Sequence, residues 1–438
     1  MTGRDRRKFV YITAGAGGMI CGSCLRDNSL VKALQRNGSE IVLIPIYTPL
    51  KLDEDDVSLN KVFFGGINVF LQQKFPLFRH LPHWMISFLD HPLLLKKVAS
   101  GYIETRAQFL GKLTLSMLKG IRGLQAREVD RFVEFLNFSI QPNLVNLSNL
   151  LISGIVPEIK SKLGISVVVT LQGDDVFLNR LKEPYRSQVV KEIKKIIPSL
   201  DGFIVFSRSY GKKMARMLDI PKSKIHYVPL GLNTENYSCK VPSLETRRSP
   251  CIGYLARVCP EKGLDVLVKS FIELKQRAGM EEVELHVAGW LGSEQRLFYK
   301  EILSELSSVG LKKNFHYHGV LDGQGKRDFL RNIDLFCVPT LDCEPKGLYV
   351  LEALASGVPV VEPDHDSFRE LLGQSGGGVF FKSGDQLSLV DTLQDLLQDP
   401  ERRQKLARQG HRRVHRDFTA MRMAEETLNV YHKIMGCA

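Results

Sequence analysis

Short apolar runs alternate with amphipathic helical stretches along almost the whole chain. In the first half, the apolar runs predict strands at 8–13, 40–47, 143–148, 166–171, 201–206 and 224–229. After residue 250 the same rhythm predicts strands at 251–256, 283–288, 315–319, 334–339, 358–361 and 378–381. The helical spacing of apolar residues between these runs predicts helices. Strands that alternate with helices are typical of βαβ units, so we expect two α/β domains built on parallel sheets.

A short polar segment separates the two series of strands and predicts a hinge near residues 235–250. We expect a first domain at 1–235, a second domain at 236–415, and a C-terminal helix at 416–438 that could cross back to the first domain. The rhythm is interrupted between about 65 and 141, where the pattern predicts a helical insertion rich in aromatic and basic residues. Such an insertion often carries specificity, but it could also be a cap over a sheet edge.

Ligands of open parallel sheets bind beside the carboxyl ends of the strands, at the point where the strand order reverses. Two such domains facing each other would form a cleft lined by the loops that follow the strands. We therefore expect the functional residues in those loops.

The first predicted strand ends in a glycine-rich turn that contains Gly15, Gly17 and Gly18. Glycines permit a tight turn and let backbone amides approach a ligand closely. The next helix starts near Ser23, so its positive end would point at the same place, which suits a phosphate. The spacing is not a clean G-x-G-x-x-G, and the second strand ends without an acidic residue. Both details argue against a nicotinamide site.

Two short motifs could be redox or metal sites, but each also has a purely structural interpretation. Cys21 and Cys24 form a C-x-x-C at a helix start, which could be a redox pair or half of a zinc site, or only two small residues that pack a tight turn. Asp53-Glu54-Asp55 has the letters of a metal-binding D-x-D. It lies in a polar acidic run, and we therefore expect a solvated loop and no metal site.

Two further loops place polar side chains after strands. The strand at 166–171 runs into Gln172 and Gly173, which can point a polar group into the cleft or form a plain turn. The first strand of the second domain is followed by Arg257 and Lys262, which bracket a short turn before a helix. A guanidinium and an ammonium group in this position match a diphosphate, although both could also be solvated surface cations.

The strongest local signal follows the strand at 334–339. Glu344 lies in the loop after this strand, a helix is predicted to start at Leu348, and Glu352 lies in its second turn. The backbone amides of Gly347 and Leu348 at the helix start can hold an anion. Carboxylates beside a phosphate site would repel it, unless they accept hydrogen bonds from paired sugar hydroxyls. One acid could take the donor sugar and the other the ribose.

The segment from Glu344 to Glu352 resembles the E-x7-E pattern of the family 4 glycosyltransferases, which are group 1 glycosyl transferases with the GT-B fold. The element Val228–Asn233 is similar to the family's VPNG segment. The likeness is strong over 251–365, fair over 200–235, and weak across the helical insertion.

This resemblance implies two Rossmann-like doubly wound domains that face each other across a cleft. It implies a retaining, metal-independent transfer of a sugar of the hexose type from a nucleotide diphosphate sugar, with no cofactor. Glu344 would contact the transferred sugar, and Glu352 would bind the ribose hydroxyls. The diphosphate would be held by the two cations, the helix start and the glycine turn: Arg257, Lys262, Gly347, Leu348, Gly17 and Gly18.

Two positions depart from the family pattern. Gln172 stands where the family usually has a histidine that contacts the donor sugar. Glutamine can hydrogen-bond a hydroxyl but cannot carry a proton at neutral pH, so either this subfamily manages without the histidine or the activity is altered or lost. Lys346 stands where an aromatic residue is common, and its charge could contact a donor or acceptor phosphate or face solvent.

The net charge of +12 at pH 7 and a pI of about 9.2 favour anionic partners such as phosphates, or indicate only a basic surface. No run reaches the roughly 18 apolar residues that span a bilayer, and the eight cysteines are mostly scattered. We therefore expect a cytoplasmic protein with reduced thiols. The segment 189–197 is basic and amphipathic, which would allow peripheral contact with the inner face of the membrane or describe an ordinary surface helix.

Three functions remain open at this point. The sequence favours a glycosyltransferase that acts on a lipid, oligosaccharide or small-metabolite acceptor, and it indicates no nucleic-acid partner. A sugar-nucleotide epimerase of the same fold would use the same nucleotide site. An inactive basic binding or adaptor homologue would explain Gln172 and the positive charge, but not the intact E-x7-E with both cations.

Overall fold

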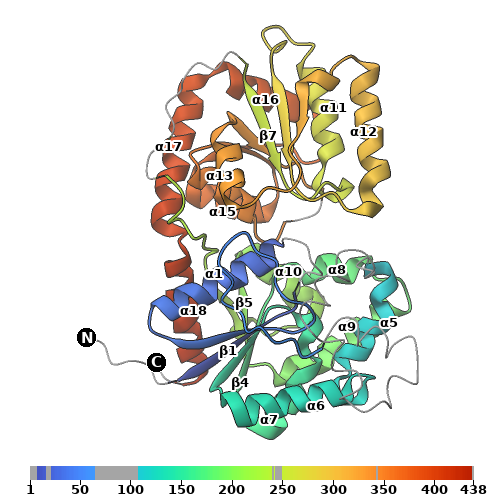
Figure 1. The fold of residues 1–438 in the computed structure, drawn as a ribbon, viewed down its shortest axis with the longest axis vertical. Coiled ribbons are helices and arrows are strands. Elements are labelled where there is room, and N and C mark those ends of the chain that lie inside the picture. The colour runs from blue at the N-terminus through green and yellow to red at the C-terminus, as the bar shows by residue number, and fades with distance from the viewer. Residues whose placement is uncertain are drawn as a thin grey trace. The chain divides into compact units, whose positions relative to one another are not determined.

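The computed structural model describes the chain in six ranges: 7–15, 21–64, 107–238, 241, 249–341 and 344–436. It divides into two compact units, Met1–Gly231 together with Ala420–Ala438, and Leu232–Thr419 (Figure 1). In sequence, the second unit is thus inserted between the last helix and the rest of the first unit. Three of the expected features lie outside the described residues: Gly17, Gly18 and the part of the insertion at 65–106.

The first unit contains a six-stranded parallel sheet with the strand order β2-β1-β3-β4-β5-β6. Its strands are β1 (Lys8–Thr13), β2 (Glu40–Pro45), β3 (Leu144–Leu147), β4 (Ser166–Thr170), β5 (Gly202–Val205) and β6 (Ile225–Tyr227). All six lie within the predicted runs, which confirms the strand predictions for this half. The order changes direction between β1 and β3, so the loops that follow these two strands flank the switch point.

Eight α-helices are described in this unit: α1 (Gly22–Arg36), α5 (Ala107–Leu118), α6 (Ala126–Phe135), α7 (Val156–Leu163), α8 (Asp174–Arg180), α9 (Tyr185–Ile196), α10 (Arg208–Leu218) and α18 (Ala420–Ile434). The last of these, α18, packs against α1 although nearly 400 residues separate them in the chain (Figure 1). The rings of Phe9 and Tyr431 lie 5.3 Å apart between centroids, and both side chains are buried. The C-terminal helix is thus part of the first unit.

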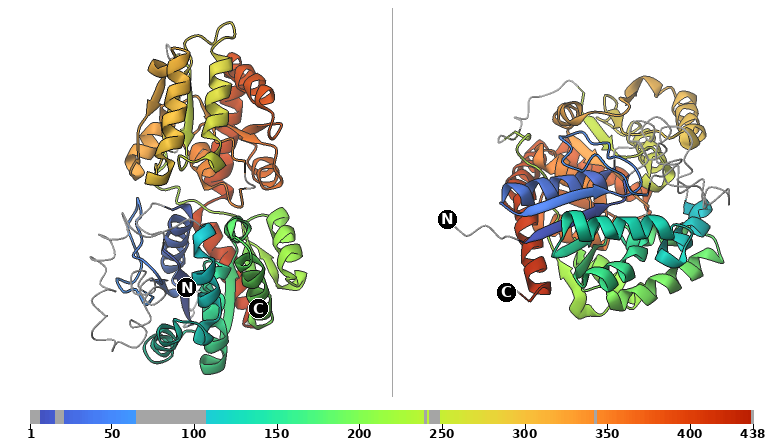
Figure 2. Two further views of the ribbon diagram at one scale, coloured as in Figure 1. Left: turned by 90° about the vertical axis from the view of Figure 1, so that its right-hand side faces the viewer. Right: turned by 60° about the horizontal axis from the view of Figure 1, so that its bottom comes forward.

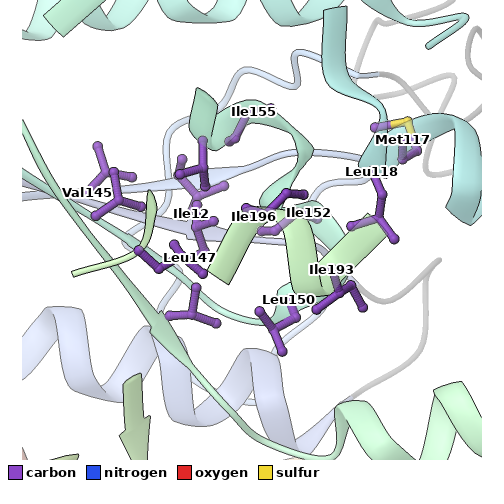
Figure 3. Close-up of a cluster of buried hydrophobic side chains, with 14 of the residues drawn as sticks. Ile12, Met117, Leu118, Val145, Leu147, Leu150, Ile152, Ile155, Ile193 and Ile196 are labelled. Carbon is purple, nitrogen blue, oxygen red and sulfur yellow. The ribbon is translucent and has the colours of Figure 1, made fainter. Parts of the chain in front are cut away.

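Figure 3 shows part of the apolar core of this unit. Side chains from two strands, from the segment after β3 and from the helices α5 and α9 meet in it: Ile12, Met117, Leu118, Val145, Leu147, Leu150, Ile152, Ile155, Ile193 and Ile196. The strands carry continuous apolar runs because helices cover both faces of a parallel sheet. This packing fixes the ends of the strands and therefore the positions at which the following loops begin.

The second unit contains another parallel six-stranded sheet, with the order β12-β11-β10-β7-β8-β9. Its strands are β7 (Cys251–Leu255), β8 (Glu284–Ala288), β9 (Phe315–Tyr317), β10 (Leu335–Cys337), β11 (Val360–Pro363) and β12 (Gly378–Phe381). Read from its own first strand, this is the strand order of a dinucleotide-binding Rossmann domain. The switch point therefore lies between β7 and β10, which are neighbours in the sheet.

The sheet of the second unit lies between helices on both sides (Figure 2). These helices are α11 (Leu264–Leu274), α12 (Arg296–Ser308), α13 (Gly323–Arg331), α14 (Leu348–Ala355), α15 (Asp366–Ser375), α16 (Gln386–Gln398) and α17 (Pro400–Asp417). Among the helices that the structure describes in either unit, none combines the length and the apolar character that crossing a bilayer requires.

The two ends of the second unit lie next to each other. Leu232 and Thr419 form an isolated parallel bridge, and the Leu232 amide donates a hydrogen bond to the Phe418 carbonyl oxygen at 2.8 Å. The segments through which the chain enters and leaves this unit are therefore paired through their backbones.

The long helix α17 packs closely on α14, the helix that carries Glu352. This close approach depends on Gly410: a Cβ atom there would lie 2.7 Å from Leu354 Cδ2 and 2.8 Å from the Cα of Gly377. Both distances are shorter than real Cβ atoms show, and backbone cannot easily move away. Gly410 therefore sets the distance between α17 and the helix of the E-x7-E segment.

We expect Gly410→Ala to lower the thermal unfolding midpoint, because overpacking of this kind costs about 1–3 kcal/mol. Gly373→Ala is the matched control, since this glycine also lies in a helix but has no atom within 4 Å of a built Cβ. The control should be neutral or stabilising by about 0.5–1 kcal/mol, because alanine is the better helix former. Scanning calorimetry on both variants would test this, and equal midpoints would contradict the packing argument.

Candidate active site

Hydrogen bonds join two loops of the second unit at the switch point of its sheet. The Glu261 carbonyl oxygen, in the loop after β7, accepts hydrogen bonds from Thr340 Oγ1 at 3.0 Å and from the Leu341 amide at 3.1 Å, both in the loop after β10. Gly263 has a φ of +68°, and a Cβ there would lie 2.0 Å from the Pro339 carbonyl oxygen. Only glycine allows this approach, so the two loops hold their functional residues at fixed positions.

Lys262 and Glu344 form an ion pair across these loops through Nζ and Oε2. Their side chains are 18% and 11% exposed, and Lys262 Nζ also lies 5.2 Å from the ring centroid of Tyr349. Burial by itself would raise the pKa of Glu344, but the charge and hydrogen bond of Lys262, with Lys346 and the Gly347 amide, lower it to about 2. Glu344 is therefore a carboxylate at neutral pH.

The start of α14 orients this carboxylate. The amides of Lys346 and Gly347 both lie 3.4 Å from Glu344 Oε1 and donate hydrogen bonds to it. Gly347 caps the helix with a φ of +73°, and a Cβ there would lie 2.9 Å from Leu371 Cδ2. The next amide, that of Leu348, begins the helix, where the first-turn N–H groups have no acceptor within the helix.

Glu352 lies in the second turn of α14 and is 6% exposed. Its Oε1 atom accepts a hydrogen bond from Lys326 Nζ at 2.5 Å, and the two side chains are 9% and 12% exposed. Lys326 was not foreseen, because a lysine on an amphipathic helix looks like an ordinary surface residue in sequence. The pair places an acid and a cation together at a position that solvent barely reaches.

Arg257 lies on the same loop as Lys262 but does not join the ion pair. Its side chain is exposed and makes no hydrogen bond or ion pair with any side chain in the described ranges. Its carbonyl oxygen accepts a hydrogen bond from Tyr254 Oη at 2.9 Å, which fixes the turn after β7. The guanidinium group is therefore free to meet an anion.

A second acid near the pair was not foreseen. Glu362 lies in β11 with no exposed surface, and neither of its carboxyl oxygens has a hydrogen-bond partner. Burial raises its pKa well above the usual range and the Glu344 charge adds to this, while Lys262 acts in the opposite direction. In the sequence, the hint was an acid that directly follows the predicted apolar run 358–361.

Gln172, in the first unit, lies at the carboxyl end of β4 and is 8% exposed. Its Nε2 group donates to the Ser148 carbonyl oxygen at 2.8 Å and to Asp27 Oδ1 at 3.4 Å. Asp27 is fully buried, pairs with Arg26 Nη2 at 2.5 Å and accepts from Thr13 Oγ1 at 2.8 Å. Groups from the ends of β1, β3 and β4 thus form one polar network, of which the sequence analysis identified only Gln172.

The turn that carries Gln172 is held by its neighbour Asp174. This carboxylate accepts hydrogen bonds from the amides of Leu150 at 2.6 Å and Gln172 at 3.1 Å. Burial raises the pKa of Asp174 to about 6, although these backbone hydrogen bonds oppose the shift. The Gly173 amide also donates to Tyr210 Oη at 2.9 Å. Gln172 is therefore placed by a rigid turn.

The remaining motifs of the first unit lie in the turn after β1, at the start of α1 and in the acidic run 53–56. Gly15 has a φ of +79°, and a Cβ there would lie 2.5 Å from the Thr48 carbonyl oxygen, so this turn needs glycine. Cys21 and Cys24 are not joined by a disulfide bond. In the acidic run, Glu54 Oε1 accepts a hydrogen bond from Asn28 Nδ2 at 2.8 Å, which ties the run to α1.

Comparison with solved structures defines the fold class. The structure is similar to sucrose-phosphate synthase from Thermosynechococcus elongatus, with a TM-score of 0.72, 15% identity, and coverage of 99% of this chain and 100% of that one. It is also similar to HepE of Anabaena in complex with UDP, with a TM-score of 0.68, 14% identity, and coverage of 97% and 100%. These neighbours confirm the predicted GT-B class of two Rossmann-like α/β domains.

The sequence of the second unit matches a family model. Residues 240–413 match the model of the group 1 glycosyl transferases, the family that the E-x7-E segment resembles. Phosphatidyl-myo-inositol mannosyltransferase of Mycobacterium leprae is 28% identical over 47% of this chain and 53% of its own length. D-inositol 3-phosphate glycosyltransferase of Xylanimonas cellulosilytica is 29% identical over 54% and 58%. The chain thus spans little more than half the length of these relatives.

The buried Glu362 predicts a pH-dependent stability. Above pH 4.5 the unfolded chain loses this proton while the folded protein keeps it, so unfolding becomes more favourable as the pH rises towards the raised pKa. Glu362→Gln removes this effect, so its unfolding midpoint relative to that of the wild type should rise as the pH increases above about 4.5. Thermal unfolding at each pH measures the difference.

Glu301→Gln, which removes an exposed acid from α12, is the control for the loss of one negative charge. A difference between Glu362→Gln and the wild type that stays constant from pH 5 to 8 would show that Glu362 is already ionised in the folded protein.

Proposed function

We propose that this protein is a retaining glycosyltransferase that moves a sugar from a nucleotide diphosphate sugar to an acceptor hydroxyl. The observation that carries the proposal is the Lys262–Glu344 ion pair at the start of α14, where a cation and a sugar-binding carboxylate lie side by side. A diphosphate sugar carries the complementary groups next to each other: phosphate oxygens, which cations bind, and hydroxyl groups, which donate hydrogen bonds to carboxylates.

The diphosphate would lie at the switch point of the second unit. Lys262, Arg257 and Lys346 supply three positive charges there, and the amides of Gly347 and Leu348 add the positive end of α14. Glu362, when protonated, adds no opposing charge. A nucleotide diphosphate donor is also supported by the fold neighbour HepE, which is solved with UDP and with UDP-glucose.

The two acids of the E-x7-E segment would recognise hydroxyl groups. Glu344, held as a carboxylate, would accept hydrogen bonds from the transferred sugar, while Glu352 would bind the ribose hydroxyls. Charged acceptors form hydrogen bonds that are about twice as strong as neutral ones, so both acids would also fix the orientation of the donor. Gln172, at the carboxyl end of β4, would contact a sugar hydroxyl through its amide group.

The reaction needs no side-chain nucleophile in this proposal. As the bond between sugar and phosphate breaks, negative charge builds on the leaving phosphate, and Lys262, Arg257 and the amides at the start of α14 stabilise it. The acceptor hydroxyl attacks from the face that the phosphate leaves, and a phosphate oxygen takes the hydroxyl proton. The new bond then has the anomeric configuration of the donor. Neither a metal ion nor a cofactor takes part.

The acceptor would be a lipid, an oligosaccharide or a small metabolite. The names of two relatives mention phosphatidyl-myo-inositol and inositol 3-phosphate, which makes inositol compounds the first acceptors to test. Contact with an anionic membrane surface would have to be electrostatic at α9, because the apolar residues Val189, Ile193 and Ile196 are buried in the core. Lys194 and Lys195 of this helix pair with Asp219 and Glu192, so a membrane contact would compete with these ion pairs.

The cation pair gives a direct test of the donor site. We expect Arg257→Ala and Lys262→Ala each to lower kcat/KM for the donor about 10–100-fold, because a lost charge-assisted hydrogen bond costs about 1.5–3 kcal/mol. Calorimetric titration with UDP and GDP should show weaker binding in the same variants. Arg412→Ala on α17 is the control, since it removes an exposed arginine from the same unit. Full activity in both test variants would refute the proposed donor site.

The stereochemistry separates the proposed reaction from its alternative. NMR of the product should show a new glycosidic bond with the donor's anomeric configuration, formed only when an acceptor is present. Conversion of the donor alone into an isomeric sugar nucleotide would instead establish an epimerase. Binding of neither UDP-sugars nor GDP-sugars would indicate a protein that has lost the activity.

A further inference from the structure

A cluster of metal-binding side chains lies on the sheet of the second unit, apart from the loops of the proposed donor site. It consists of five residues on three neighbouring strands and the loop after the last: Cys251, Glu284, His286, His316 and His318. Cys251 is the first residue of β7, whereas Arg257 and Lys262 follow its carboxyl end. Cys251 and Glu284 are thus the first residues of β7 and β8, His286 and His316 lie in the middle of β8 and β9, and His318 follows β9.

The strand register brings these side chains to one face of the sheet. Cys251 pairs with Glu284 across β7 and β8, and His286 pairs with His316 across β8 and β9. Side chains two residues apart on a strand share a face, which adds His318 to the others. On the opposite face, Phe315 and Tyr317 pack against Tyr299 of α12, with ring centroids 6.4 and 5.1 Å apart.

The distances between the ligand atoms match those of a zinc site. Glu284 Oε2 lies 3.2 Å from His286 Nε2, and Cys251 Sγ lies 3.9 Å from the same nitrogen. All three atoms lie within 4.8 Å of one another. In a tetrahedral site with bonds of about 2.0–2.3 Å, neighbouring ligand atoms are about 3.3–3.8 Å apart. Small side-chain rotations would therefore place all three around one ion.

His316 supplies the fourth ligand. Its Nε2 atom lies 3.6 Å from the same Glu284 oxygen and has no hydrogen-bond partner. The side chain is 40% exposed at the edge strand β9, so its ring has room to turn towards the ion. One thiolate, one carboxylate and two imidazoles form a donor set that zinc accepts in proteins.

His318 would orient one of these ligands. Its Nε2 atom lies 3.1 Å from His286 Nδ1, so a neutral His318 can accept a hydrogen bond and leave His286 Nε2 unprotonated for the metal. Partners of this kind fix the orientation and protonation of metal-bound histidines. The ring of Phe329 packs against His318 at 5.5 Å and closes one side of the cluster.

We propose that Cys251, Glu284, His286 and His316 bind one Zn²⁺ ion that ties the edge of this sheet together. Zinc binds the thiolate, so the Cys251 proton passes to solvent when the ion enters. The edge strand β9 has only three residues, and an ion bound to β7, β8 and β9 would hold it to the sheet interior. The ion would act on stability and would take no part in the sugar transfer.

Zinc binding is measured on the full chain without a histidine tag, after treatment with a chelator and in a non-thiol reductant. Titration with Zn²⁺ alone against a chromogenic chelator should show one tight site per chain. His286→Ala and Cys251→Ser should each weaken this site by roughly tenfold or more. His226→Ala, a strand histidine of the first unit, should leave it unchanged. Glu284→Gln and His316→Ala, at more exposed positions, replace any variant that fails to fold.

Two further readouts distinguish this site from adventitious binding. Co²⁺ in place of Zn²⁺ should give the visible absorption of a tetrahedral site and a near-ultraviolet band from its bond to sulfur, and Cys251→Ser should abolish the latter. Zn²⁺ should also slow hydrogen exchange in β9. The proposal is overturned if the wild type binds no Zn²⁺ beyond a loose background, or if the four variants bind it as tightly as the wild type. The cluster is then a set of hydrogen-bonded histidines.

Discussion

The ion pair between Lys262 and Glu344 is the interaction on which the candidate site depends. Its two residues are 82 positions apart in the chain, and they meet because β7 and β10 are neighbours at the point where the strand order changes direction. A single shared carbonyl oxygen, that of Glu261, and the glycine at 263 hold their loops together. Without that backbone contact, the lysine would be a surface cation and the glutamate an ordinary loop acid.

Much of this arrangement could be predicted from the sequence, because it depends on local patterns. Buried parallel strands need continuous apolar runs, and every strand described in the two sheets falls on such a run, within two or three residues at its ends. The functional loops follow directly, since they begin where the runs stop. Glu344, Gly347 and Glu352 were recognisable for the further reason that a loop and a helix of fixed length connect them. The roles of these residues remain proposals.

The partners of these residues could not be predicted, because they depend on which strands and helices become neighbours. Lys326 reaches Glu352 from another helix, and Asp27 reaches Gln172 from α1. Neither is marked by any spacing along the chain. Glu362 directly follows a predicted apolar run, and its complete burial, which raises its pKa, could not be predicted from that position. The histidines of β8 and β9 are likewise brought together by register alone.

The bridge between Leu232 and Thr419 has a consequence for how such a protein can be rearranged. Because the inserted half begins and ends at one point, its removal would leave two nearby chain ends that a short linker could rejoin. The same property would allow the inserted half to be exchanged, as a cassette, for the corresponding half of a similar protein.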